Sequence, residues 1–472
     1  MQSQDTITAI STAQGTGGIG IIRISGESAF DIARKIFRGK TDFEKIASHT
    51  IKYGKIINPL TDETIDEVLL TKMLKPNTFT RENIIEINCH GGIIILKKIL
   101  ELVVKMGARL AEPGEFTKRA FLNGRIDLSQ AEAVIDVINS KTEESARAAI
   151  DQLEGRLSRE IKTVRNKLIK LIAHIEVTVD YPEHDIEEIT GETVFIGIKE
   201  IHEKLNDIVK GFEKGRIIRE GINVVIAGRP NVGKSSLLNA LSGKSKAIVT
   251  SVPGTTRDII EEYININGIP VKLFDTAGIR ETTDIVEKIG VEKAQKEISR
   301  ADLIIIMIDA SAGIQDEDTE IFNLAKNKKV IYLINKVDLV DDKTIEVNLS
   351  RLNNENLAHE IEDNTSLSGV IKTSLKDNKG IDELENKITD LFFRGDIKAN
   401  SDILVTNVRH KGLIDKAIES IIEACRAYEE SMPLDCITID IMNCADYLGQ
   451  ITGESVSEDV MHEIFSRFCI GK

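Results

Sequence analysis

Apolar residues recur at two different spacings along the chain, and the change of spacing predicts where one domain gives way to the next. Residues 1–118 contain short β-like runs at 19–24, 51–57, 68–74 and 84–89, separated by glycine clusters. One amphipathic segment at 92–104 has helical spacing. This pattern predicts a compact α+β domain over residues 1–118.

After residue 128 the spacing changes to that of helices. Apolar residues step by threes and fours, which places them on one helix face, at Leu153, Leu157, Ile161, Val164, Leu168, Leu171 and Ile175. Further helical segments are predicted at 196–213, 413–430, 437–448 and 454–468. These segments are typical of the core of a helical bundle.

Between the helical blocks the chain alternates strands with helices. Buried-looking strands are predicted at 223–227, 271–275, 303–309, 330–335 and 369–373. Such alternation indicates a parallel α/β domain. The simplest topology inserts this domain, residues 220–380, into an all-α domain built from residues 119–219 and 381–472.

Composition is that of an ordinary globular protein, and it excludes several classes. The 472 residues carry a net charge of −15, which argues against broad nucleic-acid binding through the global field. The five cysteines form no Cys-x-x-Cys pair, so a disulfide framework or structural zinc site is not expected. No segment looks like a signal peptide or a membrane span. We therefore expect a cytoplasmic protein without a membrane anchor.

A phosphate-binding loop follows the first strand of the α/β domain. Residues 228–235 match Gly-x4-Gly-Lys-Ser between a strand and a helix, which is the context that this motif requires. Lys234 would neutralise the outer phosphates, and Ser235 would offer its hydroxyl to Mg²⁺. The next strand ends in Asp275-Thr276-Ala277-Gly278, where the carboxylate can reach Mg²⁺ through water and Gly278 can donate its N–H to the γ-phosphate.

A second motif predicts that the base of the bound nucleotide is guanine. Asn335-Lys336-Val337-Asp338 ends a strand, and Asp338 can accept two hydrogen bonds from guanine that adenine cannot donate. Ser374 follows the last strand, where backbone N–H groups would meet the guanine oxygen, although Leu375 stands where small residues are usual. The sequence therefore predicts a GTPase. The nucleotide contacts expected from these motifs are Asn231, Val232, Gly233, Lys234, Ser235, Ser236, Asp275, Thr276, Ala277, Gly278, Asn335, Lys336, Asp338 and Ser374. The family resemblance described next adds Thr250, Ser251, Val252, Pro253, Gly254, Thr255 and Thr256.

These motifs, with residues 253–258 and 275–281, resemble the TrmE–Era–EngA–Septin branch of translation GTPases. The C-terminal Cys-Ile-Gly-Lys, together with residues 20–26, 90–92, 113–117 and 119–123, resembles one family over the whole chain, the tRNA modification GTPases called MnmE or TrmE. The resemblance implies a homodimer with a tetrahydrofolate-binding N-terminal domain, a split helical domain and an inserted G domain. It also implies a heterotetramer with the flavin-dependent subunit MnmG. The two subunits together would add a carboxymethylaminomethyl group to carbon 5 of the wobble uridine of certain tRNAs.

Residue by residue, the resemblance implies a site for 5-formyl-tetrahydrofolate or a related reduced folate at Arg23, Glu86, Arg125 and Lys472. Lysine is the familiar residue at the position of Arg125, and arginine keeps its charge. Cys469 has two interpretations that the sequence leaves open. It takes part in chemistry beside the folate, or it is a small buried side chain that anchors the tail.

GTP hydrolysis needs a group that the sequence motif lacks. Ile279 stands where related GTPases place a water-orienting glutamine, and it cannot hold a water. Asn231 is a candidate K⁺ ligand through its amide oxygen, under a loop at 250–256 that offers carbonyls. By resemblance, Thr250, Val252 and Thr255 complete the K⁺ site, Thr256 reaches Mg²⁺, and Glu287 positions the water.

Two other functions are compatible with parts of this sequence. A GTPase switch for ribosome assembly would share the G domain but leaves residues 1–118 and the C-terminal motif unexplained. A folate-dependent one-carbon transferase with an appended regulator is permitted by the N-terminal region alone.

Overall fold

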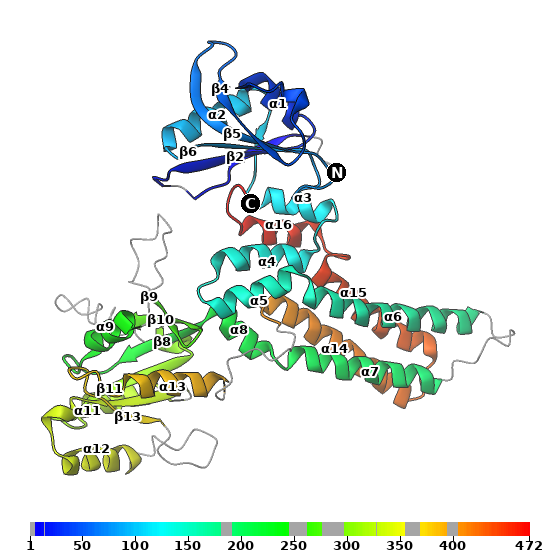
Figure 1. Cartoon of the computed structure of the whole chain (residues 1–472). Coiled ribbons are helices and arrows are strands. Elements are labelled where there is room, and N and C mark those ends of the chain that lie inside the picture. Colours follow the sequence, from blue (N-terminus) through cyan, green and yellow to red (C-terminus); the bar gives the residue numbers. More distant parts are fainter. Residues whose placement is uncertain are drawn as a thin grey trace, which may run out of the picture. The chain divides into compact units, whose positions relative to one another are not determined.

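The computed structural model describes residues 5–13, 15–180, 191–244, 262–275, 297–326, 328–354, 369–393 and 405–472. The chain forms two compact units. Unit 1 comprises Met1–Ile135, Gln152–Ile201 and Glu419–Lys472, and unit 2 comprises Asp136–Asp151 and His202–Ile418. Figure 1 shows their elements. Each unit therefore combines segments that are far apart in the sequence.

The N-terminal part of unit 1 is a mixed sheet in which the described strands follow the order β3-β4-β5-β6-β2-β1-β7 (Figure 1). Its strands are β1 (Ile7–Ile10), β2 (Ile19–Ser25), β3 (Phe37–Gly39), β4 (Thr50–Ile57), β5 (Thr64–Met73), β6 (Ile84–His90) and β7 (Arg109–Leu110). The helices α1 (Ala29–Ile36) and α2 (Ile93–Lys105) pack their apolar residues into one core with the sheet. The four predicted strands and the predicted helix are confirmed. The short β1, β3 and β7 and the helix α1 were not predicted.

The opposite face of this sheet is less covered. Side chains alternate along each strand, so Ile22 and Ile24 are buried whereas Ile21 and Arg23 lie on the other face. Cross-strand register aligns Ile51, Thr71, Glu86 and Arg23 in one row and Tyr53, Leu69, Asn88 and Ile21 in the next. These two rows are called the open face below.

Helices make up the rest of unit 1. They are α3 (Glu115–Leu122), the beginning of α4 (Leu128–Asn139), α6 (Arg156–Asp180), part of α7 (Gly191–Val209), part of α14 (Val408–Glu429), α15 (Leu434–Thr452) and α16 (Glu458–Ser466). The long α6 packs along α15. Within the predicted apolar stripe, Leu157, Ile161, Val164, Leu168 and Ile175 are buried, which confirms the helix-bundle prediction. The placement of Leu153 on the same helix face is wrong, because Leu153 ends the preceding helix and α6 begins at Arg156.

Unit 2 contains a second sheet, with the described strands in the order β13-β12-β11-β8-β10-β9. They are β8 (Ile222–Ala227), β9 (Glu262–Ile266), β10 (Ile269–Asp275), β11 (Leu303–Asp309), β12 (Val330–Asn335) and β13 (Val370–Lys372). The five predicted strands are confirmed and pair in parallel. The expectation of a wholly parallel sheet is wrong for β9, which forms an antiparallel hairpin with β10 through a tight turn at Asn267 and Gly268.

Two apolar clusters fill the two faces of this sheet. Its helices are α9 (Lys234–Lys244), α11 (Asp316–Leu324), α12 (Asp342–Asn354) and α13 (Ile381–Phe393). Ile381, Leu384 and Ile388 of α13 lie in the same cluster as the central strands. The cluster also takes in Ile217 and Ile218 of α8 (Phe212–Glu220), the helix that leads into β8.

The remaining part of unit 2 is most of α5 (Glu143–Leu153) with the ends of α4, α7 and α14. Within the described residues no helix is both long enough and apolar enough to span a membrane.

Candidate functional site

The predicted phosphate loop connects β8 to α9 at the carboxyl edge of the second sheet. Gly228, Asn231 and Gly233 have φ angles of 144°, 60° and 112°, conformations that suit glycine and asparagine. A Cβ atom on Gly228 would lie 2.6 Å from the carbonyl oxygen of Met307, and one on Gly233 would lie 2.5 Å from Nδ2 of Asn335. Both glycines are therefore required by close packing as well as by backbone conformation.

Lys234 begins α9 and is buried. Its Nζ atom donates to the carbonyl oxygens of Gly228 and Arg229, each at 2.8 Å. The ammonium group is thus held against the loop itself. Ser235 and Ser236 follow it in the first helical turn and are exposed, as is Asn231 in the loop. The positive charge and the candidate Mg²⁺ and K⁺ ligands therefore lie on one short segment.

Asn335 joins the phosphate loop to the strands that carry the predicted base site. It is only 3% exposed, and its Nδ2 donates to the carbonyl oxygen of Val232 at 2.8 Å. Its Oδ1 accepts from the hydroxyl of Thr373 at 3.3 Å and from the backbone N–H of Leu375 at 3.4 Å. One buried amide therefore fixes the loop relative to the segment after β13. Leu375, which departs from the usual small residue, keeps its N–H in this network.

Asp338 and Ser374 meet at the same edge because β12 and β13 are parallel neighbours. The hydroxyl of Ser374 lies 2.9 Å from Oδ1 of Asp338 and 3.0 Å from Oδ2 of Asp377. The structure thus brings Asn335, Asp338 and Ser374 together with the phosphate loop.

Lys336 has a partner that the sequence analysis missed. Its Nζ lies 2.6 Å from Oδ2 of Asp309, the last residue of β11. Burial alone would raise the pKa of Asp309, but the hydrogen bonds from Lys336 and Ser311 outweigh it and hold that pKa below its usual value. The signal was available, since Asp309 ends a central parallel strand, where such side chains meet the ligand-binding edge.

Several predicted residues lie outside the described part of the chain. They are Thr250, Ser251, Val252, Pro253, Gly254, Thr255, Thr256, Thr276, Ala277, Gly278 and Glu287. The backbone of Asp275 is described and ends β10, in parallel register with Ile226 of β8. Asp275 therefore lies beside the strand that leads into the phosphate loop.

A second cluster of predicted residues lies on the open face of the N-terminal sheet. Arg23 and Glu86 are cross-strand partners, with Nε and Nη2 of the arginine 2.9 and 2.8 Å from Oε1 of the glutamate. Nη1 of Arg23 donates to the carbonyl oxygen of Gly471 at 3.4 Å, and its guanidinium carbon lies 5.6 Å from the ring centroid of Phe116. The C-terminal tail thus returns to the strand that carries Arg23.

Gly471 makes this return possible. Its φ of 91° suits glycine, and a Cβ atom there would collide with the carbonyl oxygen of Ile10. Its own carbonyl accepts a hydrogen bond from the hydroxyl of Ser11 at 3.1 Å. Lys472 is therefore placed next to the Arg23–Glu86 pair.

Arg125 packs on the aromatic side chain of Phe79. Its Nη1 donates to the carbonyl oxygen of Phe79 at 3.0 Å, and its guanidinium lies over the Phe79 ring. Phe79 packs against the same small apolar cluster as Phe116, which lies under Arg23. The two arginines therefore flank one aromatic cluster without contacting the same group.

Cys469 is exposed, so the interpretation of a buried anchor does not hold for this side chain. Phe468 supplies the anchor instead, since it is 6% exposed and packs with Phe465 and Leu128. The backbone carbonyl of Cys469 accepts from the N–H of Gly114 at 3.4 Å. The exposed thiol therefore lies on the same C-terminal tail as Gly471 and Lys472.

Comparison with known proteins identifies what this chain is similar to. Residues 6–125 match the family model for the GTP-binding protein TrmE N-terminus, and residues 128–469 match the model for the MnmE helical domain. The tRNA modification GTPase MnmE of Acetivibrio thermocellus is 66% identical, with 100% of both chains covered. The proteins of the same name from Alkaliphilus oremlandii and Clostridioides difficile are each 50% identical, covering 100% and 99% of both chains, respectively.

Proposed function

The chain belongs to the MnmE family of tRNA modification GTPases, and on that premise we propose the details of its activity. It is a GTP hydrolase that acts in tRNA modification. In the proposal it is activated by K⁺ and works with a flavin-dependent partner, MnmG. Together they add a carboxymethylaminomethyl group to carbon 5 of the wobble uridine of certain tRNAs.

The observation that carries the GTPase assignment is the buried Asn335 amide. It ties Val232 of the phosphate loop to Leu375 beside Ser374, so the phosphate and base segments are held as one site. Asp338 presents a carboxylate at this edge, which suits the two donors of guanine. Asp338 is exposed in the structure, so a base without these donors would leave the carboxylate unpaired only where the base covers it, at a cost of about 1–3 kcal/mol.

Hydrolysis is proposed to depend on two cations. Ser235 and Thr256 would bind Mg²⁺, with Asp275 acting through water, while Lys234 neutralises the outer phosphates. Asn231 with Thr250, Val252 and Thr255 would bind K⁺, and Glu287 would position the water. The exposure of Asn231 and Ser235 at the mouth of the phosphate loop supports these assignments.

A reduced folate such as 5-formyl-tetrahydrofolate is proposed to bind beside Arg23, Glu86 and Lys472, with Arg125 nearby. A reduced folate supplies a one-carbon unit when bound. Glu86 offers acceptors to the pterin donors, and the arginines and lysine suit the glutamate tail. The convergence of Arg23, Glu86 and Gly471 on the open face supports this site, and the exposed Cys469 lies on the same tail.

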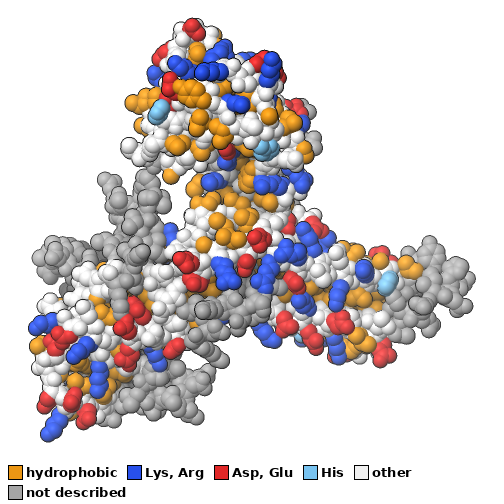
Figure 2. Space-filling view, in the orientation of Figure 1, with side chains coloured by type: hydrophobic (Ala, Val, Ile, Leu, Met, Phe, Trp, Pro, Cys, Tyr) orange, Lys and Arg blue, Asp and Glu red, His pale blue; other side chains and the backbone are white. Residues whose placement is uncertain are grey.

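The protein is proposed to be a cytoplasmic homodimer. Ile51 and Tyr53 on the open face are 60% and 57% exposed, and Leu69 beside them is 45% exposed. Figure 2 shows hydrophobic side chains gathered on the visible surface of this domain. A second copy packed on this face would remove them from water, which supports a homodimer formed by the N-terminal domains.

The deciding experiment is analysis of tRNA from a strain that lacks this gene. Mass spectrometry of nucleosides should show loss of the carboxymethylaminomethyl group from wobble uridine, restored by the wild-type gene but not by the Asp338→Asn gene. Unchanged wobble uridine with defective ribosomal subunits would instead favour the assembly-switch function. Loss of a different one-carbon modification would favour a folate-dependent transferase.

A further inference from the structure

A helical corner of the chain packs onto the G domain. This corner, Asp136–Asp151, belongs to the same compact unit as the second sheet. It comprises the end of α4, a short turn and most of α5. The turn is tightly built, because Ser145 Oγ accepts from the N–H groups of Lys141 and Thr142 at 3.0 and 3.1 Å, and Thr142 Oγ1 accepts from the N–H of Ser145 at 3.2 Å. The corner is therefore a rigid piece rather than a loose connection.

The first attachment of the corner is to the turn of the β9–β10 hairpin. A Cβ atom on Gly268 would lie 2.7 Å from Oε2 of Glu144, so the glutamate carboxylate packs directly on this turn. Nζ of Lys141 lies 5.5 Å from the ring centroid of Tyr263 on β9. The corner thus contacts the hairpin turn through Glu144 of α5 and strand β9 through Lys141, which precedes α5.

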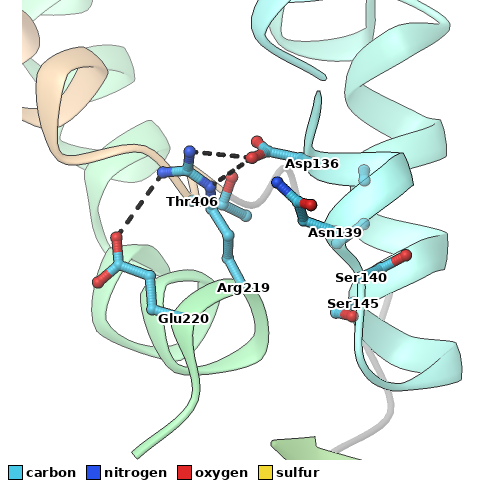
Figure 3. A pocket seen from close by; sticks show the side chains of 9 residues that line it. Asp136, Asn139, Ser140, Ser145, Arg219, Glu220 and Thr406 are labelled. Atoms are coloured by element: carbon cyan, nitrogen blue, oxygen red, sulfur yellow. Dashed lines mark hydrogen bonds and ion pairs between the residues drawn. The ribbon is translucent and has the colours of Figure 1, made fainter. Parts of the chain in front are cut away.

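The second attachment is to α8. Nε and Nη2 of Arg219 each lie 2.9 Å from Oδ1 of Asp136, and Nη1 lies 3.7 Å from Glu220 (Figure 3). The side chain of Asp136 is only 11% exposed, so solvent screens this pair less than a surface pair. Ala148 of the corner also packs against the apolar cluster that contains Ile217 and Ile218 of α8.

Between these attachments lies a small cavity. Its volume is about 170 Å³, and it is bounded by α4, α5, α8 and the segment before α14. Figure 3 shows Asn139, Ser140 and Ser145 on one side of it and Arg219 with Thr406 on the other. The corner therefore meets α8 through the Asp136–Arg219 pair and the Ala148 contact, with open space between them.

Both attachments lead directly to segments that are predicted to contact the nucleotide. β9 begins at Glu262, just after the 245–261 segment that carries Thr250 to Thr256, and β10 ends at Asp275, just before the 276–296 segment with Gly278 and Glu287. α8 continues through Gly221 into β8 and the phosphate loop. A paired hairpin moves as one body, so displacement of either of its ends also displaces the turn at Gly268.

We propose that the corner Asp136–Asp151 passes the nucleotide state of the G domain to helices α4 and α5. Glu144 packs on the hairpin turn and moves with it, while the Asp136–Arg219 pair keeps the corner attached to α8. A shift of the hairpin moves the corner, and α4 and α5, which extend beyond it to Leu128 and Leu153, move with it. This proposal rests on the GTPase activity described above, and it assigns Glu144, Asp136 and Arg219 as positioning residues.

The test is hydrogen exchange of the full chain with GDP and with GDP–aluminium fluoride, in Mg²⁺ and K⁺. Peptides within 136–151 and 262–275 should change exchange rate by about threefold or more between the two states. Glu144→Ala should abolish the change at 136–151 while peptides in 228–244 still respond. Glu143→Ala, an exposed neighbour on the same helix, should behave as wild type.

Arg219→Met provides a second route to the same result. It removes the ion pair while keeping an unbranched side chain, and it should also abolish the nucleotide-dependent change at 136–151. Identical exchange at 136–151 in the two states of the wild-type protein, with a responsive phosphate loop, would overturn this proposal alone. A phosphate loop that exchanges equally with and without GDP would overturn the GTPase assignment itself, so the two failures are distinguishable.

Discussion

At the scale of single residues, a network of charged side chains around the buried Arg119 holds the first described residues against the rest of the N-terminal domain. Arg119 is 6% exposed, and its guanidinium contacts Asp5, Glu82 and Glu115 at 2.7–3.1 Å. Glu115 is also held by Arg109, with Oε1 and Nη2 2.7 Å apart. Groups of this kind are costly to leave unpaired, so each partner depends on the others.

The first prediction concerns Glu115. Burial alone would raise its pKa, but hydrogen bonds from Arg109, the backbone N–H of Glu112 and Arg119 outweigh burial, so the pKa lies below its ordinary value. A lowered pKa stabilises the fold above the unfolded value and loses that effect as the pH falls through the folded value. Glu115→Gln should therefore destabilise the domain by about 1–3 kcal/mol at pH 7 and by much less well below pH 4.5.

The measurement is amide exchange of β2 in the wild type and Glu115→Gln across pH 2–7, a range that extends below the lowered pKa, with rates corrected for the intrinsic pH dependence. Glu27→Gln, at an exposed position in the same domain, is the control and should match the wild type. A destabilisation that stays constant across this range would show that the carboxylate charge is not what stabilises the fold.

The second prediction concerns the base. Asp338→Asn should lower kcat/KM for GTP by roughly 10⁴-fold, because the amide clashes with one guanine donor, and should raise use of xanthosine triphosphate. Steady-state turnover of both nucleotides measures this exchange, and Asp342→Asn at the exposed start of α12 is the control. Undiminished GTP use would remove Asp338 from the base site.

The third prediction concerns folate. Glu86→Ala should weaken binding of 5-formyl-tetrahydrofolate at least about tenfold, because charge-assisted hydrogen bonds to the pterin are lost. It should leave GTP hydrolysis unchanged, since Glu86 lies in unit 1 and the phosphate loop in unit 2. Calorimetric titration of both proteins gives the affinities, and Glu67→Ala, exposed on β5, is the control. Equal affinity in Glu86→Ala and the wild type would reject this folate site.

At the scale of elements, the phosphate loop depends on the neighbouring strands for its shape. Gly233 approaches Asn335 of β12, and Gly228 approaches Met307 of β11. The loop is thus shaped by its own glycines and by two strands that follow it much later in the sequence.

The fourth prediction tests this dependence. Gly233→Ala should abolish nucleotide binding, because its Cβ would lie 2.5 Å from Asn335 Nδ2 and its φ of 112° disfavours alanine. Gly243→Ala, on α9 with no atom within 4 Å of the added Cβ, should bind normally and gain about 0.5–1 kcal/mol of stability. Fluorescent GDP titration and thermal unfolding measure both. Normal GDP affinity in Gly233→Ala would show that the loop tolerates a different shape.

At the scale of the whole molecule, the two proposed sites lie in different compact units. Arg23, Glu86 and the tail belong to unit 1, whereas the phosphate loop, Asn335 and Asp338 belong to unit 2. Hydrolysis in unit 2 lacks the usual glutamine, since Ile279 stands in its place. Another group must therefore supply positive charge at the phosphates and orient the attacking water.

The fifth prediction is that K⁺ accelerates GTP hydrolysis much more than Na⁺, with G domains dimerised in the accelerated state. A charge placed against the phosphates can replace part of the roughly 10³–10⁵-fold contribution of an arginine finger. Turnover in the two chlorides at equal ionic strength, and light scattering with GDP–aluminium fluoride, measure the effect.

Asn231→Gly is the informative variant for this prediction. It removes the amide while tolerating the φ of 60°, where alanine would add strain of about 1–2 kcal/mol. K⁺ stimulation that survives in Asn231→Gly would defeat the proposed ligand. Normal turnover in Glu287→Ala would dismiss only the water-positioning group.

The sequence by itself determined the features that depend on neighbouring residues. A phosphate loop is one contiguous turn, so the motif at 228–235 can be found from the sequence alone, as can the motif at 335–338. Apolar residues recur every two residues in half-buried strands and every 3.6 residues in helices, so most strands were predicted correctly. Tertiary structure decided what joins distant segments: the antiparallel β9, the Asp309–Lys336 contact, Gly471 beside Ile10 and Glu144 on Gly268. These contacts form between segments that are far apart in the sequence. No local pattern of residues therefore predicts them.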